Sequence, residues 1–396
     1  MKCPHAVVAT LVLLVLAALT AVAPAARADA AARRSPSAPT GATAWAGDAT
    51  AFLRWAAPTA GAATVTGYTI TPVIGGALRS PRRVGAAARA ATITGLGNGS
   101  SVRFRIAATS PVGSGPSVET GNVTIGSSPL TRSSSWLDIV NYLRQTAGDG
   151  VVTASPAWTA DLQAHMRYLA GTPATHRTGA YASAHTEDPS SPWFTPGGRT
   201  AAASADLLSR DLGSASANVA AWASSPFHAI GLIRPALRSS AYAAGAGGAG
   251  IDVVRGLDRT APNPSNPVLL PGPGAITTLR AYSGAERPDP LESCAGFRSP
   301  GLPIVALLST PPPAGTTATL RQPDGTTVSG ADLCVITARN FVSTDAVYGA
   351  SGRSVLKDSN AVVVIARHPL QLGRQRVTLI PAGQPRISWT FSVIAA

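Results

Sequence analysis

The hydrophobic period of the chain changes twice along its 396 residues, which a single uniform fold does not produce. Between about residues 37 and 126 apolar and polar residues alternate, as in VRFRI at 102–106, and a period of two is typical of a half-buried strand. Between about residues 136 and 257 apolar residues recur at intervals of three and four, the period of an amphipathic helix. From about residue 276 the alternation returns. We therefore expect two or three domains of different classes.

Residues 1–30 are typical of a secretory signal peptide. Lys2 comes before a long apolar run, and the small residues after the run fit an A-x-A cleavage site that ends at Ala28 or at Ala30. Because the apolar run is somewhat long for a signal, an uncleaved membrane anchor is the alternative. We expect a secreted, extracellular protein that has no membrane span once the signal is removed.

Two cysteines remain after the signal, Cys294 and Cys334. An exported chain with two cysteines favours one disulfide bond, and two free buried thiols are the alternative. In the chain-entropy model, closing a loop of about 40 residues stabilises the fold by roughly 4 kcal/mol.

The chain carries a formal net charge of +13, and nearly all of its cations are arginines, since Lys2 and Lys357 are the only lysines. Such a charge favours binding to anionic polymers such as cell-wall glycans or nucleic acid. The arginines are scattered, however, and no aromatic residues interleave with them as a nucleic-acid platform requires. We therefore expect no specific nucleic-acid binding, and we expect the positive charge to give the protein at most a weak affinity for the cell wall.

Residues 36–126 contain short strand-like runs between turn residues, as in a β-sandwich. The segment TITGLGNGSSVRFRIAATSPVGSGPS, residues 92–117, closely resembles the late strands of a fibronectin type III domain. The resemblance implies that Trp55 is the core tryptophan and Leu96 the turn leucine. Val102 stands where the family usually has a tyrosine whose hydroxyl pins the corner. An all-β Ig-like sandwich of this family is mostly a spacer or a binding module.

A Ser/Thr-rich linker at residues 127–134 leads to a helical region at 135–258. Ser135 fits the N-cap of a first helix, and Ser155 followed by Pro156 fits the start of a second. Further helices are expected at residues 203–212 and 217–223, with short extended pieces between them. This mixture predicts an α+β domain.

The helical region carries five short motifs in a fixed order: Trp158 with HMRY at 165–168, His185 with TPGG at 195–198, SADL at 204–207, SPFH at 225–228 and RPAL at 234–237. In this order and spacing they resemble the bacterial branch of the CAP superfamily, also called SCP or PR1-like. The resemblance implies an αβα sandwich. His165 lies on the apolar face of its helix, which predicts a core or rim residue.

In the CAP superfamily two histidines and two glutamates typically face each other across a cleft that can hold zinc. His185 and His228 match the two histidines. Ala205 and Ser225 stand at the positions of the glutamates, so both acids are expected to be missing. If the match is shifted by one residue, Asp206 replaces one of them.

We therefore predict a cleft lined by His185, His228, Glu187 and Ser225. Two histidines bind zinc weakly unless Glu187, Asp188 or water completes the ligand set. We expect no cofactor, with zinc on His185 and His228 as the alternative. Ser225 lies three residues before His228 but has no G-x-S-x-G elbow around it, which argues against a serine nucleophile.

A Pro-rich linker at residues 259–275 precedes the last region, 276–396. PDG at 323–325 predicts a turn, VVVI at 362–365 a buried strand, and the alternation from Ile387 to Val393 a half-buried one. The region resembles the Ig-like, all-β sandwich that often follows bacterial CAP domains. A disulfide between Cys294 and Cys334 would cross-link this sandwich.

From these observations we expect a secreted or cell-wall-associated binding protein, a monomer with a degenerate two-histidine cleft. Its partner would be a cell-wall glycan, a lipid or a protein. The alternative is an extracellular hydrolase, or an accessory protein, that acts on polysaccharide or peptidoglycan. A glycosidase needs two carboxylates at a suitable separation, and the CAP-like region has no convincing pair. Sensing of a metal or a proton by the two histidines is a third hypothesis.

Overall fold

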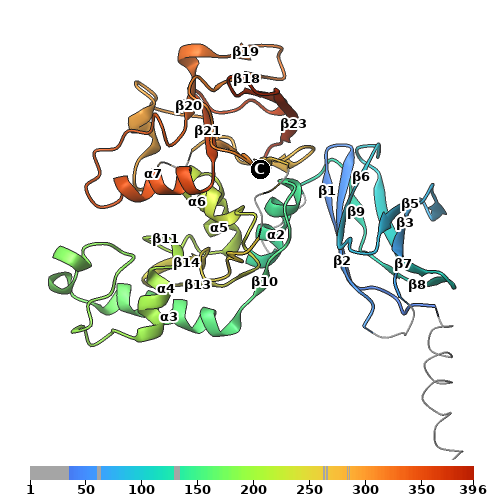
Figure 1. Cartoon of the computed structure of the whole chain (residues 1–396), viewed down its shortest axis with the longest axis horizontal. Coiled ribbons are helices and arrows are strands. Elements are labelled where there is room, and N and C mark those ends of the chain that lie inside the picture. The colour runs from blue at the N-terminus through green and yellow to red at the C-terminus, as the bar shows by residue number, and fades with distance from the viewer. Residues whose placement is uncertain are drawn as a thin grey trace, which may run out of the picture. The chain divides into compact units, whose positions relative to one another are not determined.

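The computed structural model describes residues 35–59, 64–128, 134–261, 264, 266–282, 284 and 286–396 (Figure 1). The chain divides into two compact units. The first unit comprises the described residues up to Ile125 apart from Ala46–Thr50, and the second comprises Ala46–Thr50 with Gly126–Ala396. The predicted signal peptide at residues 1–30 lies outside the described residues.

The first unit is an all-β sandwich. One sheet has the order β1-β2-β6, and the other has the order β4-β3-β7-β8, with β5 paired to β3 and β9 to β7. The strands are β1 (Thr40–Gly47), β2 (Thr50–Ala56), β3 (Gly67–Ile74), β4 (Ala77–Leu78), β5 (Arg82–Gly85), β6 (Ala90–Thr94), β7 (Ser101–Ser110), β8 (Gly113–Glu119) and β9 (Val123–Thr124).

The predicted alternation in β7 is confirmed, since Val102, Phe104 and Ile106 are fully buried in the core between the two sheets. Arg103 and Arg105 point to the other face, where both pair with Glu119 of β8. Trp55 and Leu96 are buried in the same core, as predicted. Val102 therefore contributes packing at a position where a tyrosine would contribute a hydroxyl.

The second unit contains the helices of the described chain. They are α2 (Trp136–Thr146), α3 (Pro156–Gly171), α4 (Pro196–Ala202), α5 (Ala215–Ala223), α6 (Pro226–Leu232) and α7 (Gly349–Asp358). Ser135 caps α2 as predicted, because its side chain accepts a hydrogen bond from the Asp138 backbone N–H. Pro156 and Pro226 lie in the first turns of α3 and α6, where a missing N–H costs nothing.

The helix predicted at residues 203–212 is wrong. Residues Ala205–Leu208 form strand β11, which pairs antiparallel with β14 (Gly248–Asp252), itself paired with β13 (Tyr242–Gly245). Ala and Leu favour a helix locally, but β14 contains small residues that let β11 pack closely, and tertiary pairing overrides propensity. A second short pair joins β10 (Thr153–Ala154) to β12 (Ser239–Ser240).

Two further sheets occupy the last third of the chain. One has the order β15-β17-β21-β20 and the other β16-β23-β22-β18-β19. The strands are β15 (Val268–Leu270), β16 (Ile276–Thr277), β17 (Ile304–Leu307), β18 (Thr317–Arg321), β19 (Thr327–Val328), β20 (Leu333–Ile336), β21 (Ala361–Ala366), β22 (Gly373–Ile380) and β23 (Ile387–Val393). The predicted strands at 362–365 and 387–393 and the turn at 323–325 are confirmed.

Strand β21 is buried on both faces. Val363 and Ile365 belong to one core, which also contains side chains of α2, α5 and α6, whereas Val362 and Val364 belong to the core between the two sheets. Helix α7 packs beside β21 (Figure 1), so residues 276–396 are not entirely β. The shared core crosses the predicted linker at 259–275. The division of the second unit into a CAP-like and an Ig-like domain at these residues stays a prediction.

Candidate functional site

Helix α6 presents His228 to a buried carboxylate. The His228 backbone N–H donates a hydrogen bond of 2.8 Å to Oε1 of Glu286, and its Nδ1 lies 3.1 Å from the same oxygen. The Nδ1 contact is not well directed for a hydrogen bond, so we describe it as an ion pair. Burial lowers the pKa of His228, but the close contact and negative charge of Glu286 and the charge of Asp206 outweigh burial and raise this pKa.

Strand β11 supplies a second carboxylate, Asp206. Its Oδ2 lies against α6 at Gly231, where a Cβ atom would be 2.5 Å away. This oxygen is buried and has no hydrogen-bond partner among the described residues. Burial raises the pKa of Asp206 to about 7, although the charges of His228 and Arg234 lower it. Near neutral pH the carboxyl group is therefore close to half protonated.

His185 lies in the loop before α4. Its Nδ1 is 2.9 Å from the Ala202 carbonyl oxygen, and because a carbonyl only accepts, we assign the ring proton to Nδ1. The Nε2 lone pair is then available to a ligand or to a proton. Burial lowers the pKa of His185, the bond to Ala202 raises it, and the charges of His228 and His165 lower it further. The imidazole is neutral at pH 7.

These four side chains form one electrostatic neighbourhood, which we call the histidine cluster: His185, Asp206, His228 and Glu286. The charge of His228 acts on the pKa of His185 and on that of Asp206. The pKa values of Asp206 and His228 are raised, and the pKa of His185 is lowered. Such shifts are frequent where side chains exchange protons with a ligand.

Two residues predicted to line a cleft have other partners. Glu187 is buried, with Oε1 2.8 Å from Nδ1 of His165 and Oε2 accepting from the Thr195 backbone N–H. His165 Nε2 lies 3.0 Å from the Ala184 oxygen, so His165 is a bonded core residue, as predicted. The hydroxyl of Ser225 is buried and donates to the carbonyl oxygen one turn earlier in the chain.

Ala205 and Ser225 stand at the glutamate positions implied by the resemblance, but the folded chain places two other carboxylates, Asp206 and Glu286, near His228. The sequence reasoning missed Glu286 because it assigned residues 276–396 to another domain. One signal was available: the chain has four glutamates, Glu119, Glu187, Glu286 and Glu292, and two of them pair with histidines.

The donors of the cluster do not fit a zinc site. Structural and catalytic zinc sites take three or four protein ligands, and the described residues contain no group of three or more His, Cys, Asp or Glu side chains so placed. Nδ1 of His228 already faces Glu286. Zinc held by His185 and His228 stays a prediction.

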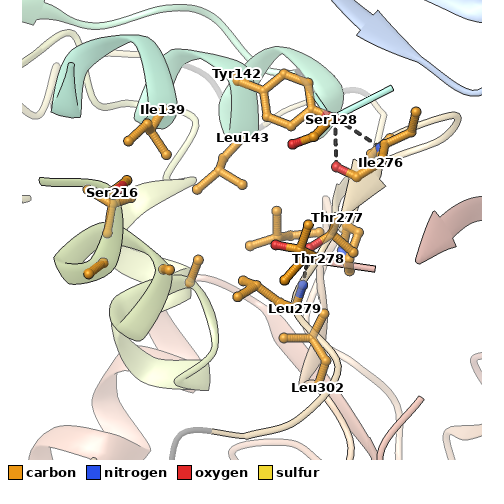
Figure 2. A pocket seen from close by; sticks show the side chains of 18 of the residues that line it. Ser128, Ile139, Tyr142, Leu143, Ser216, Ile276, Thr277, Thr278, Leu279 and Leu302 are labelled. Carbon is orange, nitrogen blue, oxygen red and sulfur yellow. Dashed lines mark hydrogen bonds between the residues drawn. The ribbon is translucent and has the colours of Figure 1, made fainter. Parts of the chain in front are cut away.

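A separate cavity of about 920 Å³ lies between α2, α5 and residues 270–279 (Figure 2). In Figure 2, Ile139 and Leu143 extend from α2 on one side, and Leu279 and Leu302 lie across from them. Other apolar members of the wall are Leu212, Ala217, Val219, Ala220, Ala223, Leu270 and Pro271. We call this space the α2–α5 cavity. Its volume falls in the range of small-molecule sites.

Polar groups in the wall of the α2–α5 cavity have partners within the protein. The Tyr142 hydroxyl donates to the Ile276 carbonyl and accepts from the Ile276 N–H, each at 2.9 Å (Figure 2). The Thr277 hydroxyl accepts from the Leu279 N–H, and the Ser214 hydroxyl caps α5. Because these three hydroxyl groups are already bonded, an apolar ligand suits this part of the wall better than a polar one.

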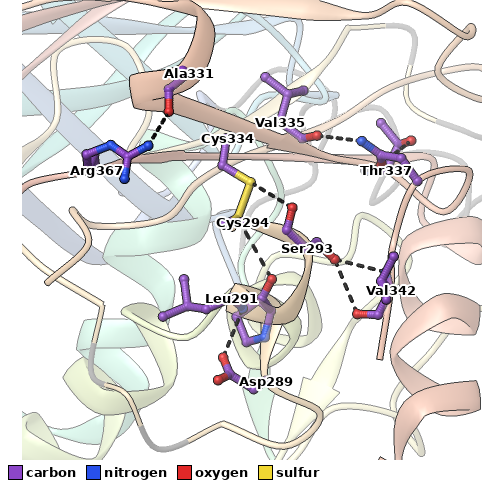
Figure 3. The surroundings of a disulfide bond; sticks show 12 residues. Asp289, Leu291, Ser293, Cys294, Ala331, Cys334, Val335, Thr337, Val342 and Arg367 are labelled. Atoms are coloured by element: carbon purple, nitrogen blue, oxygen red, sulfur yellow. Dashed lines mark hydrogen bonds between the residues drawn. A yellow bond between two sulfur atoms is a disulfide. The ribbon is translucent and has the colours of Figure 1, made fainter. Parts of the chain in front are cut away.

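The predicted disulfide is confirmed: Cys294 is bonded to Cys334 of β20 (Figure 3). The bond closes a loop of 40 residues that contains β17, β18 and β19.

Among the described residues no helix is both long and apolar enough to cross a bilayer.

No protein-family model and no curated protein matches the chain. Solved structures similar to it include titin domains A168–A170, at 22% identity, covering 23% of this chain and 32% of that one, with a TM-score of 0.21. A C. elegans twitchin kinase region has 27% identity, covers 25% of this chain and 18% of that one, and has a TM-score of 0.23. The chicken CNTN1 FN1–FN3 domains have 17% identity, cover 23% and 32%, and have a TM-score of 0.21. The chain thus spans less than a third of these structures, and the sandwich assignment rests on the strand pairing described above.

Proposed function

We propose that the protein is an extracellular binding protein that holds one long acyl chain in the α2–α5 cavity. The observation that carries the proposal is the cavity itself, about 920 Å³ in volume and lined mainly by Leu, Ile, Val, Ala and Pro side chains, with Ser, Thr and Tyr among them. Transfer of an acyl chain from water to such a wall is favourable in proportion to the apolar area removed from water.

The satisfied polar groups of the wall support this ligand class over a sugar or a peptide. A polyhydroxylated ligand would lose its hydrogen bonds to water and would find few unpaired partners in return, since Tyr142 and Thr277 already bond within the chain. The charged end of a fatty acid would remain at the mouth of the cavity.

The other parts of the chain fit an extracellular setting. Disulfides persist in oxidising compartments, and Cys294 is bonded to Cys334. As part of the proposal, residues 1–30 are a cleaved signal peptide, the first unit is a fibronectin type III spacer or wall-binding module, and the second combines a CAP-like with an Ig-like region.

Replacing a cavity residue tests the proposal. Ala220 on α5 lines the cavity, and an indole at this position would fill part of it. We expect Ala220→Trp to weaken palmitate binding at least about tenfold, or about 1.4 kcal/mol, measured by displacement of a fluorescent fatty acid. Ala157→Trp, on an exposed position of α3, is the matched control and should bind like the unmodified protein. Equal palmitate affinity of both variants would refute the cavity as the site.

A second candidate function is hydrolysis of polysaccharide or peptidoglycan at the histidine cluster. Two carboxylates and a neutral histidine beside His228 provide the groups of general acid–base chemistry, with one carboxyl near half protonation at neutral pH. Incubation with peptidoglycan and simple polysaccharides tests it. Release of reducing ends or muropeptides that His228→Ala abolishes would establish hydrolysis, and no release would exclude it for those substrates.

A further inference from the structure

The segment that carries Glu286 runs along residues 342–345 and is bonded to them at three points. Arg287 forms a 2.9 Å ion pair with Asp345, and the Thr344 N–H donates to the Glu292 carboxylate. Ser293 Oγ accepts from the Val342 N–H at 2.9 Å. All of these groups are at least partly exposed apart from the Asp345 carboxylate, so each contact by itself is worth little.

The covalent anchor of this segment is the disulfide. Cys294 follows Glu286 by eight residues and is bonded to Cys334 on β20. Figure 3 shows the bond next to Ser293, whose carbonyl oxygen lies 3.5 Å from the Cys334 sulfur. Cys294 is buried, whereas Cys334 is partly exposed, so a thiol would approach the bond from the side of Cys334.

Glu286 needs such an anchor. Its side chain is fully buried and its Oε2 has no hydrogen-bond partner among the described residues. A buried carboxylate with one unpaired oxygen is unfavourable relative to the same group in water. If the segment were free to move, Glu286 would gain by turning outward, and the disulfide opposes that movement because it fixes the end of the segment at Cys294, eight residues after Glu286.

We infer that the Cys294–Cys334 disulfide is a redox switch that places Glu286 beside His228. A dithiol reductant supplies two electrons and two protons to the cystine, so the S–S bond becomes two thiols while the reductant becomes a disulfide. The freed segment then releases Glu286 to water. Of the two described carboxylates that act on His228, Asp206 then remains, next to the neutral His185 and the cation Arg234. The inference does not depend on a ligand in the α2–α5 cavity.

The test is an NMR titration of the His228 ring in the full chain, oxidised and after treatment with dithiothreitol. In the oxidised protein the His228 midpoint should lie above the ordinary value of about 6.5, and reduction should lower it to about 6.5 or below. Glu286→Gln should show the low midpoint already in the oxidised protein and should not respond to dithiothreitol. Cys294→Ala with Cys334→Ala should show the low midpoint in either condition.

Two results would overturn the inference. In the first, reduction leaves the His228 midpoint unchanged although Glu286→Gln lowers it, which would mean that the noncovalent contacts hold Glu286. In the second, far-UV circular dichroism shows that reduction unfolds the second unit, which would make the disulfide a structural staple and not a switch.

Discussion

Tyr142 in the wall of the α2–α5 cavity and Glu286 in the histidine cluster are both buried polar side chains, but their hydrogen bonding differs. The Tyr142 hydroxyl makes two bonds with the backbone of Ile276. One oxygen of Glu286 and one of Asp206 have no hydrogen-bond partner among the described residues. The Tyr142 hydroxyl therefore has its hydrogen bonds before a ligand enters, whereas the two carboxylates of the cluster can still accept a proton or a hydrogen bond. Polar groups that already have hydrogen-bond partners suit a binding site for apolar molecules. Buried carboxylate oxygens without a partner suit a site of acid–base chemistry.

The pair His165 and Glu187 provides a reference within the same unit, because both histidine nitrogens and both carboxylate oxygens have partners. We expect Glu187→Ala to lower the free energy of unfolding by about 3–5 kcal/mol, since it leaves His165 and the Thr195 N–H unpaired in the interior. Urea denaturation of the purified protein measures this loss.

Glu286→Ala is the matched comparison. It should cost less, about 1 kcal/mol, because it also removes a buried oxygen that has no bond. Equal losses for the two glutamates would contradict the distinction between a bonded and an unbonded pair.

Tyr142→Phe should lower the free energy of unfolding by about 2 kcal/mol, because the N–H and C=O of Ile276 lose their partner in a buried place. Thermal unfolding of the variant and the unmodified protein at one pH measures the effect. A variant as stable as the unmodified protein would mean that the cavity wall does not need this bond.

Asp206→Asn should raise the free energy of unfolding at alkaline pH, whereas the substitutions above lower it. Because the pKa of Asp206 is raised from 3.8 to about 7, the folded protein holds a proton that the unfolded chain has released between these values, and stability is lost as pH rises through them. The Asn variant has no such proton to lose. At pH 8 we therefore expect its free energy of unfolding to exceed that of the unmodified protein by about 2 kcal/mol, a figure reduced because Asp206 is partly exposed. Urea denaturation at pH 4, 6 and 8 should show the difference grow with pH. Parallel pH profiles would contradict it.

Gly231→Ala should have the smallest effect on stability, within about 1 kcal/mol at pH 4, since a Cβ atom there would meet two side chains and no backbone: the movable carboxylate of Asp206 at 2.5 Å and Cγ2 of Val253 at 3.2 Å. Displacing that carboxylate toward water should also reduce the pH dependence attributed to Asp206. A full pH dependence in Gly231→Ala would show that the carboxylate does not lie against α6.

Local patterns predicted much of the fold. The alternation around Phe104, the cap at Ser135 and the disulfide all depend on residue type, spacing or compartment, and all three are confirmed. The strand β11 could not be predicted in this way, because its Ala and Leu residues favour a helix until β14 pairs with them. Helix α7 has the sequence GASGRSVLKD, whose glycine and serine residues disfavour a helix locally.

The candidate site was predicted only in part. His185 and His228 came from the resemblance of their motifs to a known family. Glu286 lies 58 residues after His228, and no local pattern connects the two. The α2–α5 cavity is formed by segments distant in sequence, from Ser128 to Ala396, so only the folded chain reveals it.

Native mass spectrometry of the protein purified from cells that secrete it tests the central claim most directly. If the α2–α5 cavity holds one long acyl chain, the protein should carry one copurifying acyl lipid, which organic extraction identifies and which Ala220→Trp lacks. An unmodified protein that carries no lipid, and takes up none when incubated with palmitate, would contradict the claim.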